Sequence, residues 1–219
     1  MDIFHWFIDF ILHIDQHLVQ MLNEYGKAVV FIIALIIFCE TGLVVTPILP
    51  GDSMIFAFGA LVAQSPALNV HLSGVVFVAA AFLGNLSNYS IGKFLGPKVY
   101  EKNYKLIKRE YLVRTKKYFE KYGAMTIIYT RFAPILRTFA PFIAGVGQMS
   151  YPRFMLYNFI GGFLWVLAFL YAGFFFGNIP FVKEHFEAIV LGIILVSLIP
   201  AVYAFAKARF GKKEVAAEK

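Results

Sequence analysis

Residues 154–182 read FMLYNFIGGFLWVLAFLYAGFFFGNIPFV, a run of apolar and small side chains that contains no Asp, Glu, Lys or Arg. Residues 72–92 and 188–206 also lack charged side chains. A helix of about 20 apolar residues crosses the roughly 30 Å hydrocarbon core of a bilayer, so each stretch is long enough to span a membrane. The whole chain is 60% hydrophobic and only 15% charged, which is too apolar for a water-soluble domain. The sequence therefore predicts an all-α polytopic membrane protein with about three full transmembrane helices.

Basic residues are distributed unevenly between the loops. Residues 98–121 contain nine Lys or Arg residues and the tail from residue 207 contains five, whereas residues 1–26 contain none and residues 178–187 only Lys183. Cytoplasmic loops of membrane proteins are enriched in Lys and Arg. We therefore expect residues 98–121 and the C-terminus to be cytoplasmic and the other two regions to lie outside. Because the net charge of +7 follows from this topology, no nucleic-acid partner is expected.

Two apolar segments are interrupted in a way that one straight helix cannot accommodate. Residues 27–69 contain Glu40 and then the sequence TPILPGDS at residues 46–53, and residues 122–150 contain two further prolines. Proline breaks a helix, and irregular backbone at membrane depth is tolerated only where protein or water covers it. We predict a re-entrant, broken helical hairpin in each segment, although residues 28–49 could instead form a full span. The residues expected to shape these hairpins are Pro47, Pro50, Gly51, Pro134, Pro141 and Gly145.

Weak internal repetition links the two segments. The tripeptide PIL at residues 47–49 recurs at residues 134–136, and each interrupted segment is followed by a full span. Paired interrupted segments are typical of transporters with inverted repeats and a binding site at the membrane midplane. We therefore predict an inverted repeat of two opposed hairpins.

The expected organisation comprises three parts. Apolar residues recur near helical spacing at the start of the chain, which favours an amphipathic helix in the membrane interface. The parts are an N-terminal interfacial amphipathic helix (1–26), a single transmembrane domain (27–206) and a basic cytoplasmic tail (207–219). The domain is expected to contain a hairpin (27–69), a span (70–95), a basic cytoplasmic helix or loop (96–121), a second hairpin (122–150) and two spans (151–178 and 186–206).

Four ionisable residues fall at membrane depth: Glu40, Asp52, Arg131 and Arg137. A charge there costs several kcal/mol unless it is paired or hydrated, so such residues are functional candidates. The fork of an arginine donates two parallel hydrogen bonds to a phosphate, which makes Arg131 and Arg137 candidates for binding a phosphate headgroup. Glu40 and Asp52 are candidates for proton coupling. A structural ion-pair network remains the alternative for all four.

Other polar features of the sequence are less specific. Asn85 and Asn88 place amides in the first full span, where they could line a cavity or form hydrogen bonds between helices. The motifs HExxH, GxSxG, a glycine-rich phosphate loop and CxxC are absent. We therefore expect no enzymatic activity, no metal site and no cofactor. The sequence leaves open whether the chain forms homo-oligomers.

Several motifs resemble those of the DedA family, part of the superfamily with the VTT (SNARE-associated) domain. They are FCETG at residues 38–42, PILPGDS at 47–53, YSIGK at 89–93, RFAPILRTFAP at 131–141 with Ala144 and Gly145, and YPRF at 151–154 with Asn158. The resemblance covers about residues 25–208. It implies a bacterial inner-membrane protein with opposed re-entrant hairpins, in a family linked to lipid translocation and proton-dependent membrane homeostasis.

The resemblance also bears on the site. The essential acids and arginines of the family carry over onto Glu40, Asp52, Arg131 and Arg137. One departure is Asn85, because some relatives are expected to have an acidic residue there. Bacterial relatives are implicated in returning undecaprenyl phosphate to the cytoplasmic leaflet.

The predicted function is the translocation of a phosphate-bearing lipid, such as undecaprenyl phosphate or a phospholipid, coupled to protons. A proton-coupled carrier of small solutes or ions and a non-transporting membrane scaffold are the alternatives. The lipid, the direction of transport and the coupling ion are left open by the sequence.

Overall fold

The computed structural model describes residues 13–43, 51–101, 123–177, 179–185, 188–189 and 191–192. Within these residues the regular structure is helical and no strand is present, as the sequence predicts. The principal helices are α2 (Ile14–Tyr25), α3 (Val29–Gly42), α4 (Gly51–Gln64), α5 (Val70–Glu101), α8 (Pro134–Val146) and α9 (Tyr151–Phe176). The short elements are η1 (Gly26–Ala28), α7 (Thr126–Tyr129), η2 (Thr130–Phe132) and α10 (Pro180–Glu184).

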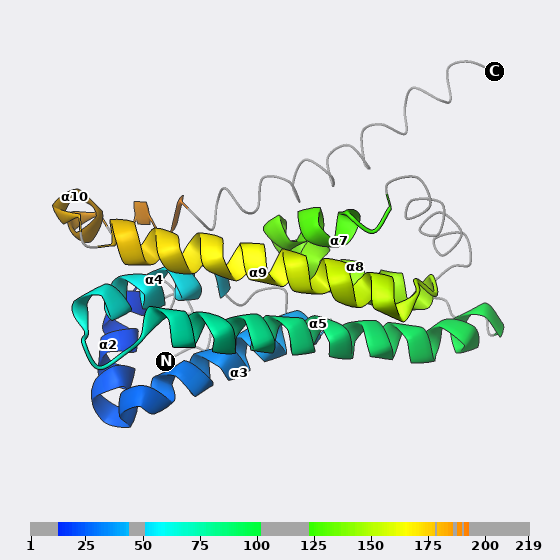
Figure 1. The fold of residues 1–219 in the computed structure, drawn as a ribbon, viewed down its shortest axis with the longest axis horizontal. Helices are drawn as coiled ribbons and strands as arrows, with labels where there is room; N and C mark the ends of the chain where they lie inside the picture. The colour runs from blue at the N-terminus through cyan, green and yellow to red at the C-terminus, as the bar shows by residue number, and fades with distance from the viewer. Residues whose placement is uncertain are drawn as a thin grey trace, which may run out of the picture.

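Two long helices, α5 and α9, form the frame of the molecule and run side by side in opposite directions (Figure 1). Residues Val70–Gly96 and Tyr151–Phe176 are each long and apolar enough to cross a membrane, and they coincide with the expected spans at 70–95 and 151–178. α5 continues to Glu101, into the region expected to form a basic helix or loop. The rest of that region, most of the expected span 186–206 and the tail 207–219 lie outside the described residues.

The chain bends before α3. Ile14 and Leu18, one helical turn apart on α2, are buried, while Gln16 and Gln20 are exposed, so α2 is amphipathic. Gly26 then adopts a φ of 56°, a conformation that favours glycine, and α3 leaves at an angle to α2 (Figure 1). Taken together, residues Gln16–Gly42 form a third stretch of helix long and apolar enough to cross a membrane. Residues 1–12 lie outside the described part of the chain.

Two apolar helices, α4 and α8, are too short to span a bilayer. They contain 14 and 13 residues, which at 1.5 Å per residue is about 20 Å. α4 packs mainly on α9, α8 packs mainly on α5, and α3 also packs on α5. The frame of α5 and α9 is thus flanked by three short helices, whose ends approach one another near the middle of the molecule (Figure 1).

Glycines allow these helices to approach closely. A Cβ atom on Gly173 of α9 would overlap the carbonyl oxygen of Phe56 in α4. A Cβ atom on Gly145 of α8 would likewise overlap the carbonyl oxygen of Tyr89 in α5. Gly145 therefore serves close helix packing one residue before the end of α8, and it does not lie at a bend.

The prolines of the second interrupted segment have different positions. Pro134 is the first residue of α8, where the missing N–H of proline leaves no helical hydrogen bond unmade. Pro141, expected to interrupt this segment, instead lies inside the continuous helix α8. Pro47 and Pro50 lie outside the described residues, and Gly51 is the first residue of α4.

Candidate functional site

A buried cluster of charged residues lies where α3, α4 and α8 meet. Arg137 of α8 donates from Nη1 to Oδ1 of Asp52 in α4 and from Nη2 to Oε1 of Glu40 in α3. Glu40, Asp52 and Arg137 have relative exposures of 0%, 6% and 5%. Three of the four residues predicted from the sequence are therefore in direct contact.

Trp165 of α9 completes this cluster. Its Nε1 donates to Oδ1 of Asp52 at 2.9 Å, and its ring centroid lies 5.1 Å from the guanidinium carbon of Arg137. The aromatic face adds a cation–π contact to a cation that has lost its hydration. Asp52 thus accepts hydrogen bonds from two helices, and the cluster ties α3 and α4 to α8 and α9.

The positions of these residues on their helices explain why they depend on one another. Glu40 lies in the last turn of α3 and Arg137 in the first turn of α8, where the helix dipoles disfavour an acid and a base respectively. The ion pair between them offsets both penalties. Asp52, in the first turn of α4, has a favourable position. Gly51 leaves room beside Glu40, because a Cβ atom there would overlap the Glu40 carboxylate.

Arg131 is buried apart from the two carboxylates, and its hydrogen-bond acceptors are neutral. Its relative exposure is 2%, and its Nη2 donates to Oδ1 of Asn158 at 2.5 Å and to the carbonyl oxygen of Ala81 at 3.3 Å. Gly161 and Gly162 make room for the side chain, since a Cβ atom on either would lie within 3.4 Å of it. In the described part of the chain, Arg131 forms no ion pair with a carboxylate and its Nε has no hydrogen-bond partner. The cluster and Arg131 together hold two acids and two arginines, as the sequence suggests.

The asparagines of α5 are also buried. Nδ2 of Asn88 donates to the carbonyl oxygen of Thr41 at 3.2 Å and to that of Thr138 at 2.7 Å, so Asn88 connects α3 and α8 through α5. Asn85 is 2% exposed, and its Oδ1 has no partner among the described residues. Hydrogen bonding between helices thus explains why Asn88 is buried in α5. The amide oxygen of Asn85 remains without a hydrogen-bond donor among the described residues.

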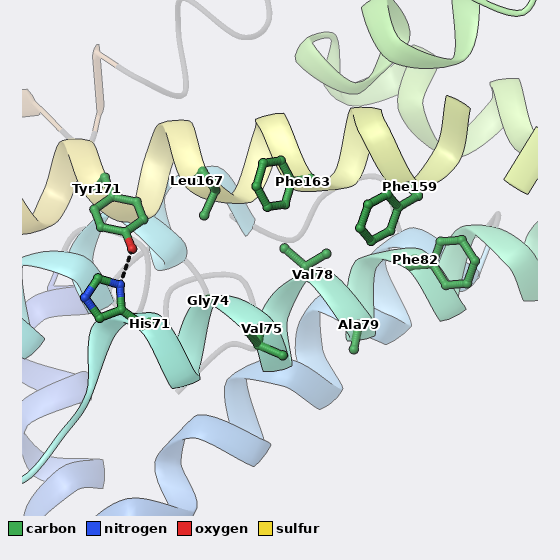
Figure 2. Close-up of a pocket in the computed structure, with 10 residues that line it drawn as sticks. All are labelled: His71, Gly74, Val75, Val78, Ala79, Phe82, Phe159, Phe163, Leu167 and Tyr171. Carbon is green, nitrogen blue, oxygen red and sulfur yellow. Dashed lines mark hydrogen bonds between the residues drawn. The ribbon is translucent and has the colours of Figure 1, made fainter. Parts of the chain in front are cut away.

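An open groove lies beside this region, between α5 and α9 (Figure 2). Its volume is about 580 Å³. Phe82 and Phe159 line one end, and each directly follows a residue, Ala81 or Asn158, that accepts a hydrogen bond from Arg131. Arg131 itself does not line the groove, but two of its hydrogen-bond acceptors are the sequence neighbours of residues that do.

Sequence reasoning missed Trp165 and gave Asn158 no role beyond its place in a family motif. Both carried a usable signal, because they are the tryptophan and the asparagine of an otherwise apolar span. A buried indole N–H or amide normally finds a hydrogen-bond partner, so each pointed to a polar contact inside the membrane. Among the described residues, no three His, Cys, Asp or Glu side chains gather as a metal site.

Comparison with known proteins places the chain in a family. Residues 49–175 match the VTT domain. The chain is 52% identical over 204 residues to Protein DedA of Escherichia coli K12, an alignment that covers 92% of this chain and 93% of the relative. It is 42% identical over 170 residues to an uncharacterized membrane protein of Mycobacterium leprae, covering 77% of this chain and 76% of that protein.

A more distant relative is the inner membrane protein YghB of Escherichia coli K12, which is 31% identical over 194 residues, or 88% of this chain and 85% of the relative. No solved structure is detectably similar to the chain. The names of these relatives and the three long apolar helices agree that the protein is embedded in a membrane. The residues that match the VTT domain include Asp52, Arg131 and Arg137. Because this match and the similarity to DedA together extend over nearly the whole chain, the protein belongs to the DedA family of VTT-domain membrane proteins.

Proposed function

We propose that this protein translocates a phosphate-bearing lipid, such as undecaprenyl phosphate or a phospholipid, across the bacterial inner membrane in a proton-coupled cycle that supports membrane homeostasis. The observation that carries the proposal is the pair of buried arginines at membrane depth, one held by two carboxylates and the other only by neutral acceptors. Buried charges of this kind are costly, and in membrane proteins they mark substrate and ion pathways.

The architecture suits a transporter. We infer that α3 with α4, and η2 and α7 with α8, form two re-entrant hairpins that enter from opposite sides. Support comes from the short lengths of α4 and α8 and from their matching positions, since α4 packs on α9 as α8 packs on α5. In such inverted repeats the substrate site lies at the interface of the two halves. The contact of Arg137 with Glu40 and Asp52 lies at this interface.

Arg131 is the proposed first ligand of the phosphate. Its present acceptors, an amide oxygen and a backbone carbonyl, are neutral. Hydrogen bonds between a guanidinium and an anionic oxygen are roughly twice as strong as hydrogen bonds between neutral groups. A phosphate that reaches this position would therefore replace the oxygen of Asn158 as the preferred acceptor.

Arg137 is the proposed link between phosphate and protons. With both carboxylates ionised, Glu40, Asp52 and Arg137 together carry one negative charge and occupy both ends of the guanidinium fork. That arrangement repels a phosphate and leaves it only the Nε–H of the guanidinium, which has no partner among the described residues. A proton taken up by either acid removes the excess negative charge and releases one guanidinium nitrogen. Proton and phosphate therefore bind together in this scheme.

The proposal is tested by reconstitution in liposomes with leaflet-resolved detection of undecaprenyl phosphate and phosphatidic acid. Uptake of inorganic phosphate by the same liposomes serves as the comparison, because phosphate without a lipid chain is a small solute. Movement of the lipid alone supports the proposal. Uptake of inorganic phosphate without lipid movement would instead favour a small-solute carrier, and movement of neither would favour a scaffold.

A further inference from the structure

The groove between α5 and α9 has one polar end and an otherwise apolar lining (Figure 2). At the polar end, Nδ1 of His71 and the hydroxyl of Tyr171 share a hydrogen bond of 2.6 Å. Val75 and Phe163, from opposite walls, have relative exposures of 67% and 44%. The groove therefore opens on the outer surface of the bundle, which faces lipid in a membrane-embedded protein.

The length of the groove matches the depth of one leaflet. From His71 to Phe82 the groove follows α5 for about 16 Å, and from Tyr171 to Phe159 it follows α9 for about 18 Å, at 1.5 Å per residue. Half of a hydrocarbon core of about 30 Å is about 15 Å. With the His71–Tyr171 pair at the membrane surface, the rings of Phe82 and Phe159, whose centroids are 6.3 Å apart, lie near the bilayer centre.

We propose that this groove binds one hydrocarbon chain of the transported lipid phosphate, whose phosphate group is received at its mouth by His71 and Tyr171. The identity of the lipid rests on the proposed function. An apolar wall stabilises a hydrocarbon chain, whereas a phosphate inside the groove would lose its hydration without a compensating donor. The groove thus holds the chain, and the headgroup stays at the polar end until it moves inward.

The apolar end of the groove lies toward the buried arginine. Phe82 and Phe159 stand next in sequence to the two residues that accept hydrogen bonds from Arg131. The tip of a chain lying in the groove therefore points toward Arg131, and the phosphate at the mouth must move inward along the groove to reach this arginine. In the orientation predicted by the Lys and Arg distribution, the lipid is taken from the outer leaflet, because residues 178–187 follow the polar end.

Photolabelling tests the chain site directly. The probe is phosphatidic acid with a diazirine in one acyl chain, present in phosphatidylcholine vesicles that contain the full-length protein. Ala79 lines the groove and is exposed, so Ala79→Trp fills the groove without entering the core. Ala168, an exposed alanine of α9 that does not line the groove, provides the matched control Ala168→Trp. We expect Ala79→Trp to reduce labelling of residues 159–171 by about tenfold, equivalent to 1.4 kcal/mol of binding free energy, and Ala168→Trp to leave it unchanged.

The polar end is tested with the double variant His71→Ala/Tyr171→Phe. It should weaken labelling by the phosphatidic acid probe about threefold or more while labelling by a diacylglycerol with the same diazirine chain is retained, because only the former offers a phosphate to the mouth. Equal labelling of the variant and the wild type by phosphatidic acid would overturn the headgroup role of the pair.

The experiments distinguish an error in the proposed lipid-chain site from an error in the proposed translocation function. Labelling of Ala79→Trp at the wild-type level, or labelling spread evenly over the exposed faces of all helices, overturns the groove even if the wild-type protein moves lipid phosphates. Selective labelling of the groove in a protein that moves no lipid supports the binding site and overturns the translocation proposal instead.

Discussion

At the scale of single residues, the two buried arginines of the site have different hydrogen-bond partners. Arg137 is shared between the carboxylates of Glu40 and Asp52, whereas Arg131 has only neutral acceptors in the described part of the chain. A buried ion pair gains little net stability, but breaking one leaves an uncompensated charge at a cost of about 3–5 kcal/mol. Removing one of the two acids costs less free energy, because Arg137 still forms an ion pair with the remaining carboxylate.

The geometry of the guanidinium is expected to matter more than its charge. Arg137→Lys cannot hold two carboxylates on separate nitrogens of a planar fork, and Arg131→Lys cannot offer a phosphate two parallel donors. Losing one charged hydrogen bond costs about 1.5–3 kcal/mol, so lipid transport should fall about tenfold or more in each variant. Arg153→Lys, at an exposed arginine of α9, is the control and should transport normally. Full activity in both buried-site variants would remove phosphate clamping from the mechanism.

The two acids are expected to differ when they are made neutral. Glu40→Gln should fold and transport without dependence on a pH gradient, because the amide mimics a permanently protonated acid. Asp52→Asn should lose coupling and some stability as well, because Asp52 also contacts Trp165 and lies in the first turn of α4. The melting temperature in detergent and the gradient dependence in liposomes are measured together, with the exposed Glu24→Gln as control. Normal gradient dependence in a stable Glu40→Gln protein would exclude Glu40 as the proton carrier.

Sequence alone could identify the charged residues of the site but not their pairing. Glu40, Asp52, Arg131 and Arg137 stand out because charge is rare in apolar segments. Which arginine binds the acids depends on how α8 lies against α3 and α4, which no local pattern encodes. Trp165 carried a local signal for a buried polar contact, but its partner Asp52, 113 residues away in the chain, could not be identified from sequence.

At the scale of helices, close packing through glycine holds the short helices on the frame. Sequence reasoning could locate α5 and α9 from long uncharged runs, and the structure confirms long apolar helices at these positions. It could not foresee that Pro141 lies within α8 or that Gly145 packs against α5, because both effects depend on a neighbouring helix. The hairpins and their repeat remain predictions.

The packing of α4 on α9 gives a stability prediction. In Gly173→Ala the new methyl group would overlap the backbone carbonyl of Phe56, so the two helices must separate. Overpacking of this kind costs about 1–3 kcal/mol and should lower the melting temperature by several degrees, about 2–4 °C per kcal/mol for a chain of this size. Ala168→Val, at an exposed position of the same helix, should leave the melting temperature unchanged. An unchanged melting temperature for Gly173→Ala would contradict the close approach of α4 and α9.

At the scale of the whole molecule, we expect the two ends of the α5–α9 frame to lie on the two sides of the membrane. His71 meets Tyr171 at one end, and the hydroxyl of Tyr89 donates to the carbonyl oxygen of Met149 toward the other. The helices are antiparallel, so the segments after Phe176 and before Val70 emerge on the same side. The distribution of Lys and Arg predicts that this side is outside.

Labelling of single cysteines in intact cells tests this orientation. In a Cys39→Ala background, Lys183→Cys should react with a membrane-impermeant maleimide, whereas Glu110→Cys and Lys212→Cys should not. Positions 110 and 212 lie outside the described residues, and this prediction rests on charge distribution alone. Reaction of Glu110→Cys from outside would reverse the orientation and would move the proposed lipid groove to the inner leaflet.

In the proposed cycle a lipid phosphate and a proton bind and move together through the Arg137 cluster. The most direct measurement is the leaflet distribution of undecaprenyl phosphate in liposomes that contain the purified protein, followed before and after a pH gradient is imposed. We expect wild-type protein to accelerate the movement of the lipid and the gradient to shift the lipid's distribution. With Arg137→Lys protein of normal stability, we expect neither effect. Equal rates in protein-containing and protein-free liposomes, or a distribution that the gradient leaves unchanged, would contradict the proposed cycle.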